Sequence, residues 1–498
     1  MTNGADFSPF ICFVHSTFVI QHFPMLDDTI AAIATPVGEG GLAVIRISGA
    51  RALAVADRIF VPAGKHSSKV SAAASHTIQF GHVVRDGKMI DEVLIAVMRA
   101  PRTFTREDVV EITCHGGILP AKMVLEAALA NGARAAEPGE FTRRAFLNGR
   151  IDLAQAEAVA DLIHSRTELA LSAANEQLAG KLSERINQLR EDMMKTLAHV
   201  EAYIDFPEED ITEETKDQLL GRLEQGVALM DELLRTANEG QILRRGIRAA
   251  IIGRPNAGKS SLLNQLLGHD RAIVSPIPGT TRDTIEETAN IRGLPVVFID
   301  TAGLREARDE IEVEGIRRSR ESLQKAEFIL HVLDVSEPLT EADEKHLDEF
   351  VGKKRILVRN KIDLVVKLKF PEGMACSDRR LESRRNPQTR MSALHVVDVC
   401  CLSGKGIDSL KDAIKNLVWS GEIKTEMLQV MINSRHQDAL NRARAATVRT
   451  IEALRGGATL ELAAMDLRIA VNAVGEIVGK TATEDLLDMI FSQFCIGK

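Results

Sequence analysis

Residues 253–260 read Gly-Arg-Pro-Asn-Ala-Gly-Lys-Ser, the pattern of a phosphate-binding loop. The apolar run at 247–252 is typical of a buried strand, and residues 261–267 favour a helix, which is the context that the motif requires. The two glycines let the backbone turn tightly, so that its N–H groups surround phosphate oxygens. Lys259 would add a positive charge toward the β- and γ-phosphates, and Ser260 a hydroxyl for Mg²⁺. The stretch therefore predicts a nucleoside triphosphate site on an α/β domain.

Three further motifs follow in the order expected of a guanine-nucleotide hydrolase. Residues 278–283, Pro-Gly-Thr-Thr-Arg-Asp, resemble a first switch segment in which Thr281 can reach Mg²⁺. Residues 300–303, Asp-Thr-Ala-Gly, would bring a carboxylate near Mg²⁺ and a glycine N–H near the γ-phosphate. In the Asn-Lys-Ile-Asp motif at 360–363, the Asp363 carboxylate can accept hydrogen bonds from guanine N1–H and the 2-amino group. Adenine offers no such pair of donors, so the motifs predict GTP.

The composition of the 498-residue chain limits its possible functions. The length predicts about three domains, and 45% hydrophobic residues are ample for their cores. A net charge of −8 counts against a protein that coats nucleic acid, although a local basic patch could still bind RNA. The six cysteines show no paired metal-ligand spacing, which favours a reducing compartment. The cysteine usage thus predicts a cytoplasmic protein. No apolar run reaches the roughly 18 residues of a membrane span, so we expect no segment that crosses a membrane.

The first 24 residues differ from the rest of the chain. Residues 10–20 are moderately apolar but contain His15, and no basic residue precedes them. A secretory signal begins with positive charge, and a transit peptide is rich in arginine and poor in acids. Neither description fits, so we interpret residues 1–24 as a disordered or misannotated leader before Met25.

Residues 25–147 have a mixed α/β pattern. The expected elements are strands at 41–47, 92–98 and 109–113, a hairpin turn at 85–88 and a helix at 118–130. Together they predict an N-terminal α+β domain.

From residue 151 the apolar period becomes helical. A stripe that recurs every three or four residues predicts one long helix, with buried positions Leu178, Leu182, Ile186, Leu189, Met193, Leu197 and Val200. Residues 205–207, Asp-Phe-Pro, end this helix, and a second helix is expected over 215–238.

Helical patterning resumes after Trp419 and continues almost to residue 498. The GTPase module at 246–418 therefore interrupts a helical domain whose two parts are 148–245 and 419–498. Such insertion is tolerated because the ends of a compact domain lie close together. We expect movement of the switch segments to lever the flanking helices. The predicted fold class is multidomain α/β and α: an N-terminal α+β domain, a central helical domain and an inserted Ras-like P-loop GTPase domain.

Several blocks outside the GTPase motifs resemble the bacterial family of tRNA-modification GTPases known as MnmE or TrmE. They are Gly-Gly at 40–41, Arg-Ile-Ser-Gly at 46–49, Phe-Thr at 104–105 leading to Glu111, His-Gly-Gly at 115–117, Pro-Gly-Glu-Phe-Thr at 138–142, Ala-Phe-Leu-Asn at 145–148, Asp-Phe-Pro at 205–207 and Phe-Cys-Ile-Gly-Lys at 494–498. The blocks extend over all three domains, and the last of them is unusual for a GTPase.

The resemblance implies an FAD-dependent partner, MnmG, that forms a heterotetramer with the GTPase. The pair adds an aminomethyl or carboxymethylaminomethyl group to C5 of the wobble uridine of certain tRNAs, with a carbon from a methylene-tetrahydrofolate. The N-terminal domain is expected to form a homodimer and to bind the folate (a 5,10-methylene- or 5-formyl-tetrahydrofolate) through positions matching Arg46, Glu111, Arg150 and Lys498. Taken alone, Arg46 on a strand is more typical of an exposed surface charge.

The GTPase motifs lack the glutamine that orients the attacking water in Ras-like enzymes, because Leu304 occupies its position. The resemblance implies instead that K⁺ pairs two GTPase domains across the nucleotide and offsets developing charge. The matching K⁺ positions are Asn256, Ser275, Ile277 and Thr280, and the Mg²⁺ positions are Ser260 and Thr281. Glu312 matches the family's water-positioning carboxylate and is the expected catalytic residue; the alternative is a solvated charge on a helix rich in acids.

The residues expected to contact GTP come from five segments. They are Asn256, Ala257, Gly258, Lys259, Ser260 and Ser261; Ser275, Pro276, Ile277, Pro278, Gly279, Thr280 and Thr281; Asp300, Thr301, Ala302 and Gly303; Asn360, Lys361, Ile362 and Asp363; and Cys400, Cys401 and Leu402. The last three replace the Ser-Ala that usually precedes a Gly-x-Gly pattern. Since contacts there are mainly backbone, we expect binding to survive. A rival placement, Ser-Ala at 392–393, lies too far upstream of that pattern.

Three alternatives remain at this stage. Cys495 is either a nucleophile toward uridine C6 or a packing residue, and a free thiol needs activation to act as a nucleophile. A ribosome-assembly GTPase would share the GTPase motifs but lack the N-terminal domain and the ending at 494–498. A regulatory switch whose partner performs all the uridine chemistry fits the sequence as well.

The arginine-rich stretch 379–390 is expected to be an exposed loop rather than an RNA contact.

Overall fold

The computed structural model describes residues 28–64, 68–205, 213–268, 286–299, 324–341, 343, 353–369, 395–419 and 425–498. The chain divides into two compact units: unit 1 combines residues up to Arg150 with Thr483–Lys498, and unit 2 is Ile151–Ala482. The predicted leader, 1–24, lies outside the described residues. Among the described helices, none is long and apolar enough to cross a membrane.

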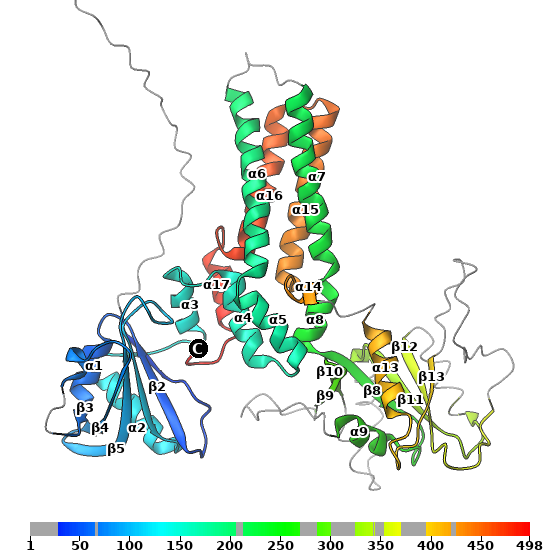
Figure 1. Cartoon of the computed structure of the whole chain (residues 1–498), viewed down its shortest axis with the longest axis horizontal. Coiled ribbons are helices and arrows are strands. Elements are labelled where there is room, and N and C mark those ends of the chain that lie inside the picture. Colours follow the sequence, from blue (N-terminus) through cyan, green and yellow to red (C-terminus); the bar gives the residue numbers. More distant parts are fainter. Residues whose placement is uncertain are drawn as a thin grey trace, which may run out of the picture. The chain divides into compact units, whose positions relative to one another are not determined.

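Unit 1 is built on a seven-stranded sheet with the order β3-β4-β5-β6-β2-β1-β7 (Figure 1). Neighbouring strands are antiparallel except for β1 and β7, which are parallel. The strands are Ile30–Ile33 (β1), Leu42–Ser48 (β2), Phe60–Pro62 (β3), Thr77–Arg85 (β4), Lys88–Met98 (β5), Val109–His115 (β6) and Arg134–Ala135 (β7). The strands, hairpin turn and helix predicted between residues 41 and 130 are confirmed.

The two faces of this sheet differ because successive side chains on a strand point to opposite sides. On one face, Ile45 and Ile95 belong to a core that includes residues of the helices Ala52–Ile59 (α1) and Ile118–Ala130 (α2). On the other face, the register places Arg46 opposite Glu111 and Glu111 opposite Ala96. This second face therefore carries charged groups at the centre of the sheet.

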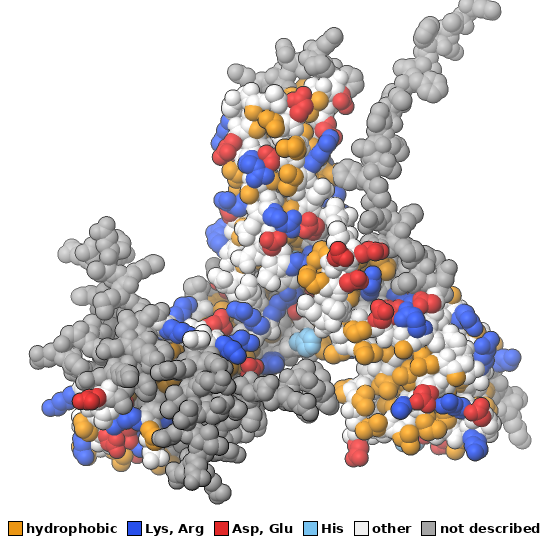
Figure 2. All heavy atoms as spheres, turned by 180° about the vertical axis from the view of Figure 1, so that it is seen from behind, with side chains coloured by type: hydrophobic (Ala, Val, Ile, Leu, Met, Phe, Trp, Pro, Cys, Tyr) orange, Lys and Arg blue, Asp and Glu red, His pale blue; other side chains and the backbone are white. Residues whose placement is uncertain are grey.

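The same second face is apolar farther along the sheet. Ile78 lies opposite Ala96, and Phe80 lies opposite Leu94. Ile78, Phe80 and Leu94 are all exposed, although large hydrophobic side chains are usually buried. Figure 2 shows hydrophobic side chains gathered on this unit, at the lower right. An apolar area of this kind is typical of an interaction surface.

The last residues of the chain pack within unit 1. Helix α17 (Glu484–Phe491) meets helix α3 (Glu140–Leu147) through the rings of Phe146 and Phe491, whose centroids are 6.5 Å apart, and through an Arg143–Asp488 ion pair of 2.8 Å. A β-bridge joins Pro138 to Ile496. Residues 483–498, predicted to lie in the second part of the helical domain, belong in the structure to the same unit as the N-terminal sheet.

Unit 2 contains a set of helices. They are Leu153–His164 (α4), Glu168–Leu178 (α5), Lys181–Asp205 (α6), Glu213–Arg235 (α7), Ala237–Arg245 (α8), Thr425–Leu428 (α14), Ser434–Gly456 (α15) and Leu460–Val478 (α16). The long ones are α6, α7, α15 and α16. Figure 1 shows α6, α7, α15 and α16 side by side, each packed against two of the others. Their common core joins residues from both sides of the GTPase module, among them Leu189 and Val474. The predicted insertion is thereby confirmed.

One detail of the helical prediction is wrong. The predicted stripe from Leu182 to Val200 is buried on α6, but Leu178 belongs to α5. Gly180 separates the two helices with a φ of 90°, a left-handed conformation that favours glycine and interrupts the helix. The apolar period continues across this break, so periodicity alone did not reveal it. The second predicted helix corresponds to α7 and is followed by the separate helix α8.

The second part of unit 2 is a six-stranded sheet with the order β13-β12-β11-β8-β10-β9. All neighbours are parallel except β9 and β10. The strands are Ile247–Ile252 (β8), Glu287–Ile291 (β9), Leu294–Phe298 (β10), Phe328–Asp334 (β11), Lys354–Asn360 (β12) and His395–Asp398 (β13). From β8 the chain builds one side of the sheet and then the other. The loop after β8 therefore leaves at the topological switch point, where such sheets bind ligands.

A buried polar network fastens the base of the helical bundle. Arg435 donates two hydrogen bonds of 2.9 and 2.8 Å to Glu157 on α4, and its guanidinium also donates to the carbonyls of Glu476 and Ile477 at the end of α16. Burial would raise the pKa of Glu157, but the neighbouring His436 and Arg435 hold that pKa well below its ordinary value. The Arg435 guanidinium of α15 thus contacts both α4 and α16.

The imidazole of His436 belongs to this network in its neutral form. Burial lowers the pKa of His436 to about 4, so the ring carries no charge at neutral pH. Its Nδ1 accepts the Asn433 N–H at 3.4 Å, and its Nε2–H donates to Glu157 at 2.8 Å. A neutral ring with one acceptor and one donor nitrogen satisfies both contacts. Arg435 is therefore the cation that balances Glu157.

Replacement of Glu157 by alanine is expected to lower the free energy of unfolding of unit 2 by about 3–5 kcal/mol, because the change leaves the Arg435 guanidinium buried without a counter-charge. Equilibrium unfolding in urea at neutral pH measures the loss. The control is Glu184→Ala on α6, which removes an exposed carboxylate and is expected to change stability by less than about 0.5 kcal/mol. Equal stability of the two variants would contradict the role of the network.

Candidate functional site

The phosphate-binding loop connects β8 to helix α9 (Lys259–Leu267). Gly253 has a φ of 145°, and a Cβ there would lie 2.3 Å from the Val332 carbonyl oxygen. Gly258 has a φ of 98°, and a Cβ there would lie 2.1 Å from the Asn360 side-chain nitrogen. Only glycine fits these two positions, for reasons of both conformation and space. The loop backbone is thus held close to its neighbours, with the first turn of α9 directly behind it.

Lys259 is folded over this loop. Its Nζ donates to the carbonyl oxygens of Gly253 at 2.9 Å and Arg254 at 2.8 Å. Burial lowers the pKa of Lys259 from its ordinary value, and an anion next to the amine would reverse that effect. The lysine therefore lies at the N-terminal end of α9, where the helix dipole also favours negative charge. Ser260, in the first turn, and Asn256, whose φ is 61°, are exposed at the same loop.

The buried side chain of Asn360 joins three parts of the candidate nucleotide site. Its Nδ2 donates to the carbonyl of Ala257 in the phosphate loop at 2.9 Å. Its Oδ1 accepts the Cys401 N–H at 3.1 Å. The predicted segments at 256–261, 360–363 and 400–402 are therefore brought together, although they are far apart in the sequence. Next to Asn360, Lys361 forms an ion pair with Asp334 at the end of β11, and this contact fixes the start of the motif.

The two cysteines that replace the usual Ser-Ala lie directly beside this motif. The Cys400 thiol donates to the Asp363 carboxylate at 3.1 Å. Burial raises the pKa of the Cys401 thiol to about 11, so this side chain remains protonated. Leu402 is 90% exposed and contributes little packing. The loop thus keeps its place next to Asp363 with a sulfur donor in place of a hydroxyl.

The remaining nucleotide-site residues lie outside the described residues. They are Ser275, Pro276, Ile277, Pro278, Gly279, Thr280 and Thr281 of the first switch, Asp300, Thr301, Ala302 and Gly303 of the second, Leu304, Glu312 and the rival Ser-Ala at 392–393. Their roles stay predictions.

A second candidate site lies on the charged face of the sheet in unit 1. The Arg46 Nε donates to the Glu111 Oε1 at 2.7 Å, and the Arg46 Nη1 donates to the Gly497 carbonyl at 3.1 Å. The guanidinium also lies 5.6 Å from the centre of the Phe141 ring. Glu111 keeps its Oε2 without a hydrogen-bond partner in the described part of the chain. This group of residues can accept and donate hydrogen bonds beside an aromatic ring.

Arg150 and Lys498 are connected to the same group of residues, which we call the folate pocket, through Phe104 and Phe141. The Arg150 Nη1 donates to the Thr103 carbonyl at 3.1 Å, and its guanidinium is 5.7 Å from the centre of the Phe104 ring. Phe104 packs against the small cluster that contains Phe141. The main-chain oxygen of Lys498 accepts the Phe141 N–H at 3.2 Å. The structure thus brings together the four residues predicted to bind folate, around two phenylalanines.

Sequence reasoning did not assign a site role to Phe104, Phe141 or Gly497. A Cβ on Gly497, whose φ is 93°, would lie 2.6 Å from the Ile33 carbonyl oxygen, so the final turn needs glycine. All three residues lie within blocks that carry the family resemblance, and that location was the available signal. Cys495 is exposed, and its carbonyl accepts the Gly139 N–H at 3.4 Å.

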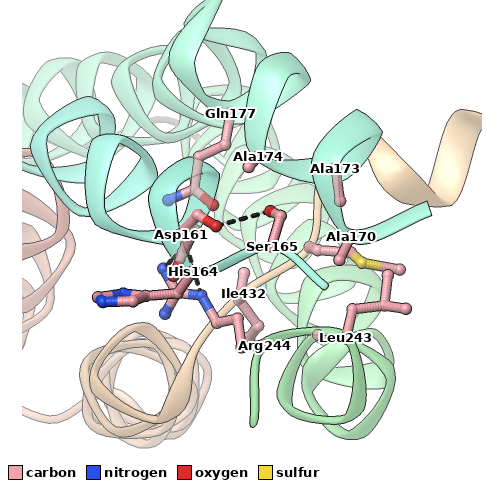
Figure 3. Close-up of a pocket in the computed structure, with 12 residues that line it drawn as sticks. Asp161, His164, Ser165, Ala170, Ala173, Ala174, Gln177, Leu243, Arg244 and Ile432 are labelled. Atoms are coloured by element: carbon pink, nitrogen blue, oxygen red, sulfur yellow. Dashed lines mark hydrogen bonds and ion pairs between the residues drawn. The ribbon is translucent and has the colours of Figure 1, made fainter. Parts of the chain in front are cut away.

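A small cavity of about 30 Å³ lies where helices α4, α5 and α8 meet the residues before α15 (Figure 3). Figure 3 shows Asp161 and Arg244 in direct contact among the residues that line it, and the Arg244 Nε donates to Asp161 at 2.6 Å. The Ser165 hydroxyl donates to the Asp161 carbonyl at 2.6 Å. This volume suits a single water molecule and excludes a nucleotide or a folate. The cavity marks a joint between helices rather than a ligand site.

The same joint connects the helices with the nucleotide-binding sheet. Ala170 on α5 and Leu243 on α8 belong to the core of that sheet. The Arg166 Nη1 donates to the Thr288 hydroxyl on β9 at 2.5 Å. The hairpin of β9 and β10 lies in sequence between the two predicted switch segments. These contacts support the expectation that switch movement reaches the helices, which stays a prediction.

Comparisons with known proteins agree with this organisation. A family model described as GTP-binding protein TrmE N-terminus matches residues 29–150, and one described as MnmE helical domain matches residues 153–495. The tRNA modification GTPase MnmE of Geobacillus kaustophilus is 48% identical over 475 residues, 95% of this chain and 99% of that protein. The MnmE of Bacillus subtilis is 45% identical over 476 residues, 95% of this chain and 100% of that protein.

Among solved structures, the G domain of the T. maritima FeoB iron transporter is 24% identical and covers 34% of this chain and 98% of that chain, with a TM-score of 0.23. A superposition this weak carries no argument about function.

Replacement of Asp363 by asparagine is expected to weaken GTP binding by roughly 10- to 100-fold, because the carboxylate that can accept two guanine donors becomes an amide. Binding of xanthosine triphosphate should improve, since its C2 carbonyl can accept from that amide. Calorimetric titration of both nucleotides checks the change. Ser403→Ala, an exposed change in the neighbouring loop, is the control. An unchanged GTP affinity would rule out base recognition by Asp363.

Proposed function

Because the chain belongs to the MnmE family of tRNA modification GTPases, we propose that it binds and hydrolyses GTP as part of tRNA modification. The observation that carries this proposal is the Asn360 side chain, which joins the phosphate loop to the loop beside Asp363. The test is mass analysis of wobble uridines after deletion of the gene, with complementation by the wild-type chain and by Lys259→Ala. Complete modification in the deletion strain would refute the proposal.

At the nucleotide site, each described residue has a defined task. The N–H groups of residues 256–261 surround the phosphates, and Lys259 exchanges its two loop carbonyls for phosphate oxygens. Asp363, aligned by the Cys400 thiol, accepts from guanine. Mg²⁺ would be held by Ser260 and Thr281 with Asp300 nearby, and it would offset charge on the phosphates. The exposed Ser260 hydroxyl in the first turn of α9 fits that task.

We assign the catalytic help to K⁺ and Glu312, on the basis of the family resemblance. Leu304 has no group that can orient water, so another residue has to do so, and Glu312 is the proposed one. K⁺ would be held by Asn256 with Ser275, Ile277 and Thr280, between two paired GTPase domains. The exposure of Asn256 and its place at the phosphate loop support its role, because an ion shared between two domains needs an accessible ligand.

We place a tetrahydrofolate derivative at the pocket of unit 1. The free Glu111 Oε2 suits donors of a pterin ring, and Phe104 and Phe141 offer aromatic surface. Arg46 and Arg150 supply positive charge for a carboxylate tail, with Lys498 at the same place. The bound folate would supply the one-carbon unit. The chain's own residues hold and orient it.

The proposed assembly is a homodimer that joins the FAD-dependent partner MnmG in the cytoplasm. The exposed apolar face of Ile78, Phe80 and Leu94 supports pairing of two N-terminal units, since burial of apolar area is the main driving force for association. The partner and the aminomethyl or carboxymethylaminomethyl product at C5 of uridine follow from the family resemblance.

K⁺ is expected to raise the rate of GTP hydrolysis by roughly tenfold or more, because it offsets charge that develops on the phosphates. Phosphate release from the full-length protein is measured in K⁺ and Na⁺ buffers of equal ionic strength. Sedimentation with GDP and aluminium fluoride should show pairing of GTPase domains in K⁺ alone. Equal rates in the two buffers would contradict the mechanism.

Removal of residues 495–498 is expected to weaken 5-formyl-tetrahydrofolate binding by roughly tenfold or more, because Arg46 loses its Gly497 acceptor and Phe141 its Lys498 acceptor. GTP hydrolysis should persist, since all these contacts belong to unit 1 and the phosphate loop to unit 2. Calorimetry, phosphate release and thermal unfolding are measured on the same preparation. Retained folate affinity would remove the tail from the site, and a lost GTPase rate would show that the tail is needed for folding.

A further inference from the structure

Two loops at the edge of the folate pocket exchange hydrogen bonds. The Arg150 Nη1 donates to the Thr103 carbonyl at 3.1 Å, and the Arg106 Nη1 donates to the Asn148 carbonyl at 3.0 Å. The Asn148 side chain donates in turn to the Thr105 carbonyl at 2.7 Å. Segments 102–106 and 148–150 are thus fastened to each other.

These loops carry positive charge that no described carboxylate balances. Arg102, Arg106 and Arg150 form no ion pair within the described residues, and the bonds of Arg106 and Arg150 go to backbone carbonyls. The acids that follow Arg106 are committed elsewhere: Glu107 accepts from Arg144 and Ser48, and Asp108 accepts the Ala100 N–H. We call these three arginines the basic rim: Arg106 and Arg150 lie at the junction of the two segments, and Arg102 belongs to one of those segments.

The helical bundle shows that this is not the general state of arginine in the chain. Four arginines of α15 each pair with a carboxylate: Arg442 with Glu476, Arg444 with Asp231, Arg449 with Asp466 and Arg455 with Glu224. Neighbouring like charges repel each other and are stabilised by an anion between them. The rim has the unbalanced positive charge of an anion-binding surface, whereas the four arginines of α15 are already paired with carboxylates.

Arg106 also holds an unusual backbone conformation. Its φ is 59°, in the left-handed region that favours glycine, and a side chain there costs about 1 kcal/mol or more. The chain keeps a long cationic side chain at a position that glycine would fill with less strain. What the arginine adds at this position is its guanidinium, which carries a positive charge and donates to the Asn148 carbonyl.

We propose that Arg102, Arg106 and Arg150 bind the additional γ-linked glutamates of a folate that carries several of them. The inference rests on the proposed folate site and extends it. Arg150, at the pocket, meets the first carboxylates, and Arg106 and Arg102 meet those that follow toward the solvent. Each added glutamate brings one more carboxylate, and guanidinium forks match carboxylates well.

The surroundings of the rim favour an oligoglutamate over RNA. Proteins that hold single-stranded RNA combine basic residues with exposed aromatic rings on which bases stack. The aromatic residues beside these loops are not exposed: Phe104 and Phe146 are half-buried, and Phe141 is buried in a cluster with Phe104. The rim thus offers charge without a stacking platform, which suits a flexible chain of carboxylates.

The experiment compares 5-formyl-tetrahydrofolate with one and with three glutamates, by calorimetric titration of the full-length protein. The triglutamate is expected to bind on the order of fivefold more tightly, which corresponds to two or three exposed ion pairs. This advantage should shrink in high salt. In the double variant Arg102→Ala, Arg106→Gly, the ratio of the two affinities should fall to about one. Glycine at 106 suits the positive φ, so the turn is retained.

Arg58→Ala is the matched control. Arg58 is also an arginine of unit 1, and it donates to the backbone carbonyl of Asn131. Its replacement by alanine is expected to leave the ratio of the two folate affinities unchanged. Equal affinities of the two folates for the wild-type protein would overturn the inference while the proposed folate site stands. Absence of monoglutamate binding would refute the folate site itself. A double variant that loses tRNA affinity but keeps the triglutamate advantage would assign the rim to RNA and overturn the proposal.

Discussion

The carboxamide of Asn360 is the contact on which the nucleotide site depends. It donates to the phosphate loop and accepts from the loop of Cys401, and its nitrogen lies where a Cβ on Gly258 would be. Three loops that follow three different strands are therefore held at fixed distances by one buried side chain. A buried amide needs its hydrogen bonds, because an unmade bond costs about 1–3 kcal/mol. The packing of the sheet therefore also positions the loops of the nucleotide site.

The joint between helices and sheet extends this dependence to the rest of unit 2. Gly246 lies between Arg245 of α8 and the first residue of β8, and a Cβ there would lie 2.8 Å from a methyl of Val297 on β10. On the helical side, Arg244 pairs with Asp161, and Arg166 reaches Thr288. The nucleotide-binding sheet is therefore packed against the helices and is not connected to them by a linker alone. Its core continues into α5 and α8, which gives a movement of the sheet a direct route to the bundle.

Charge is distributed differently in the two units. In the bundle, arginines pair across helices, and the Arg435 guanidinium of α15 contacts both Glu157 on α4 and the end of α16. In unit 1, some arginines are paired, as Arg144 is with Glu140, whereas the rim of Arg102, Arg106 and Arg150 is not. Paired charges hold helices in register, and unpaired charges are free to meet an anion. Both kinds of arginine occur in a chain whose net charge is −8.

The sequence by itself determined the elements whose causes are local. Apolar period, glycine positions and motif order predicted the strands of the first domain, the strand–loop–helix of the phosphate site and the insertion of one domain into another. The break between α5 and α6 was not predicted, because the apolar period continues across Gly180. Only the tertiary structure decided which distant segments meet: Asn360 with Ala257 and Cys401, and Arg46 with Gly497. Such contacts depend on how whole helices and strands pack. The number of residues between two positions does not give the distance between their side chains in the folded protein.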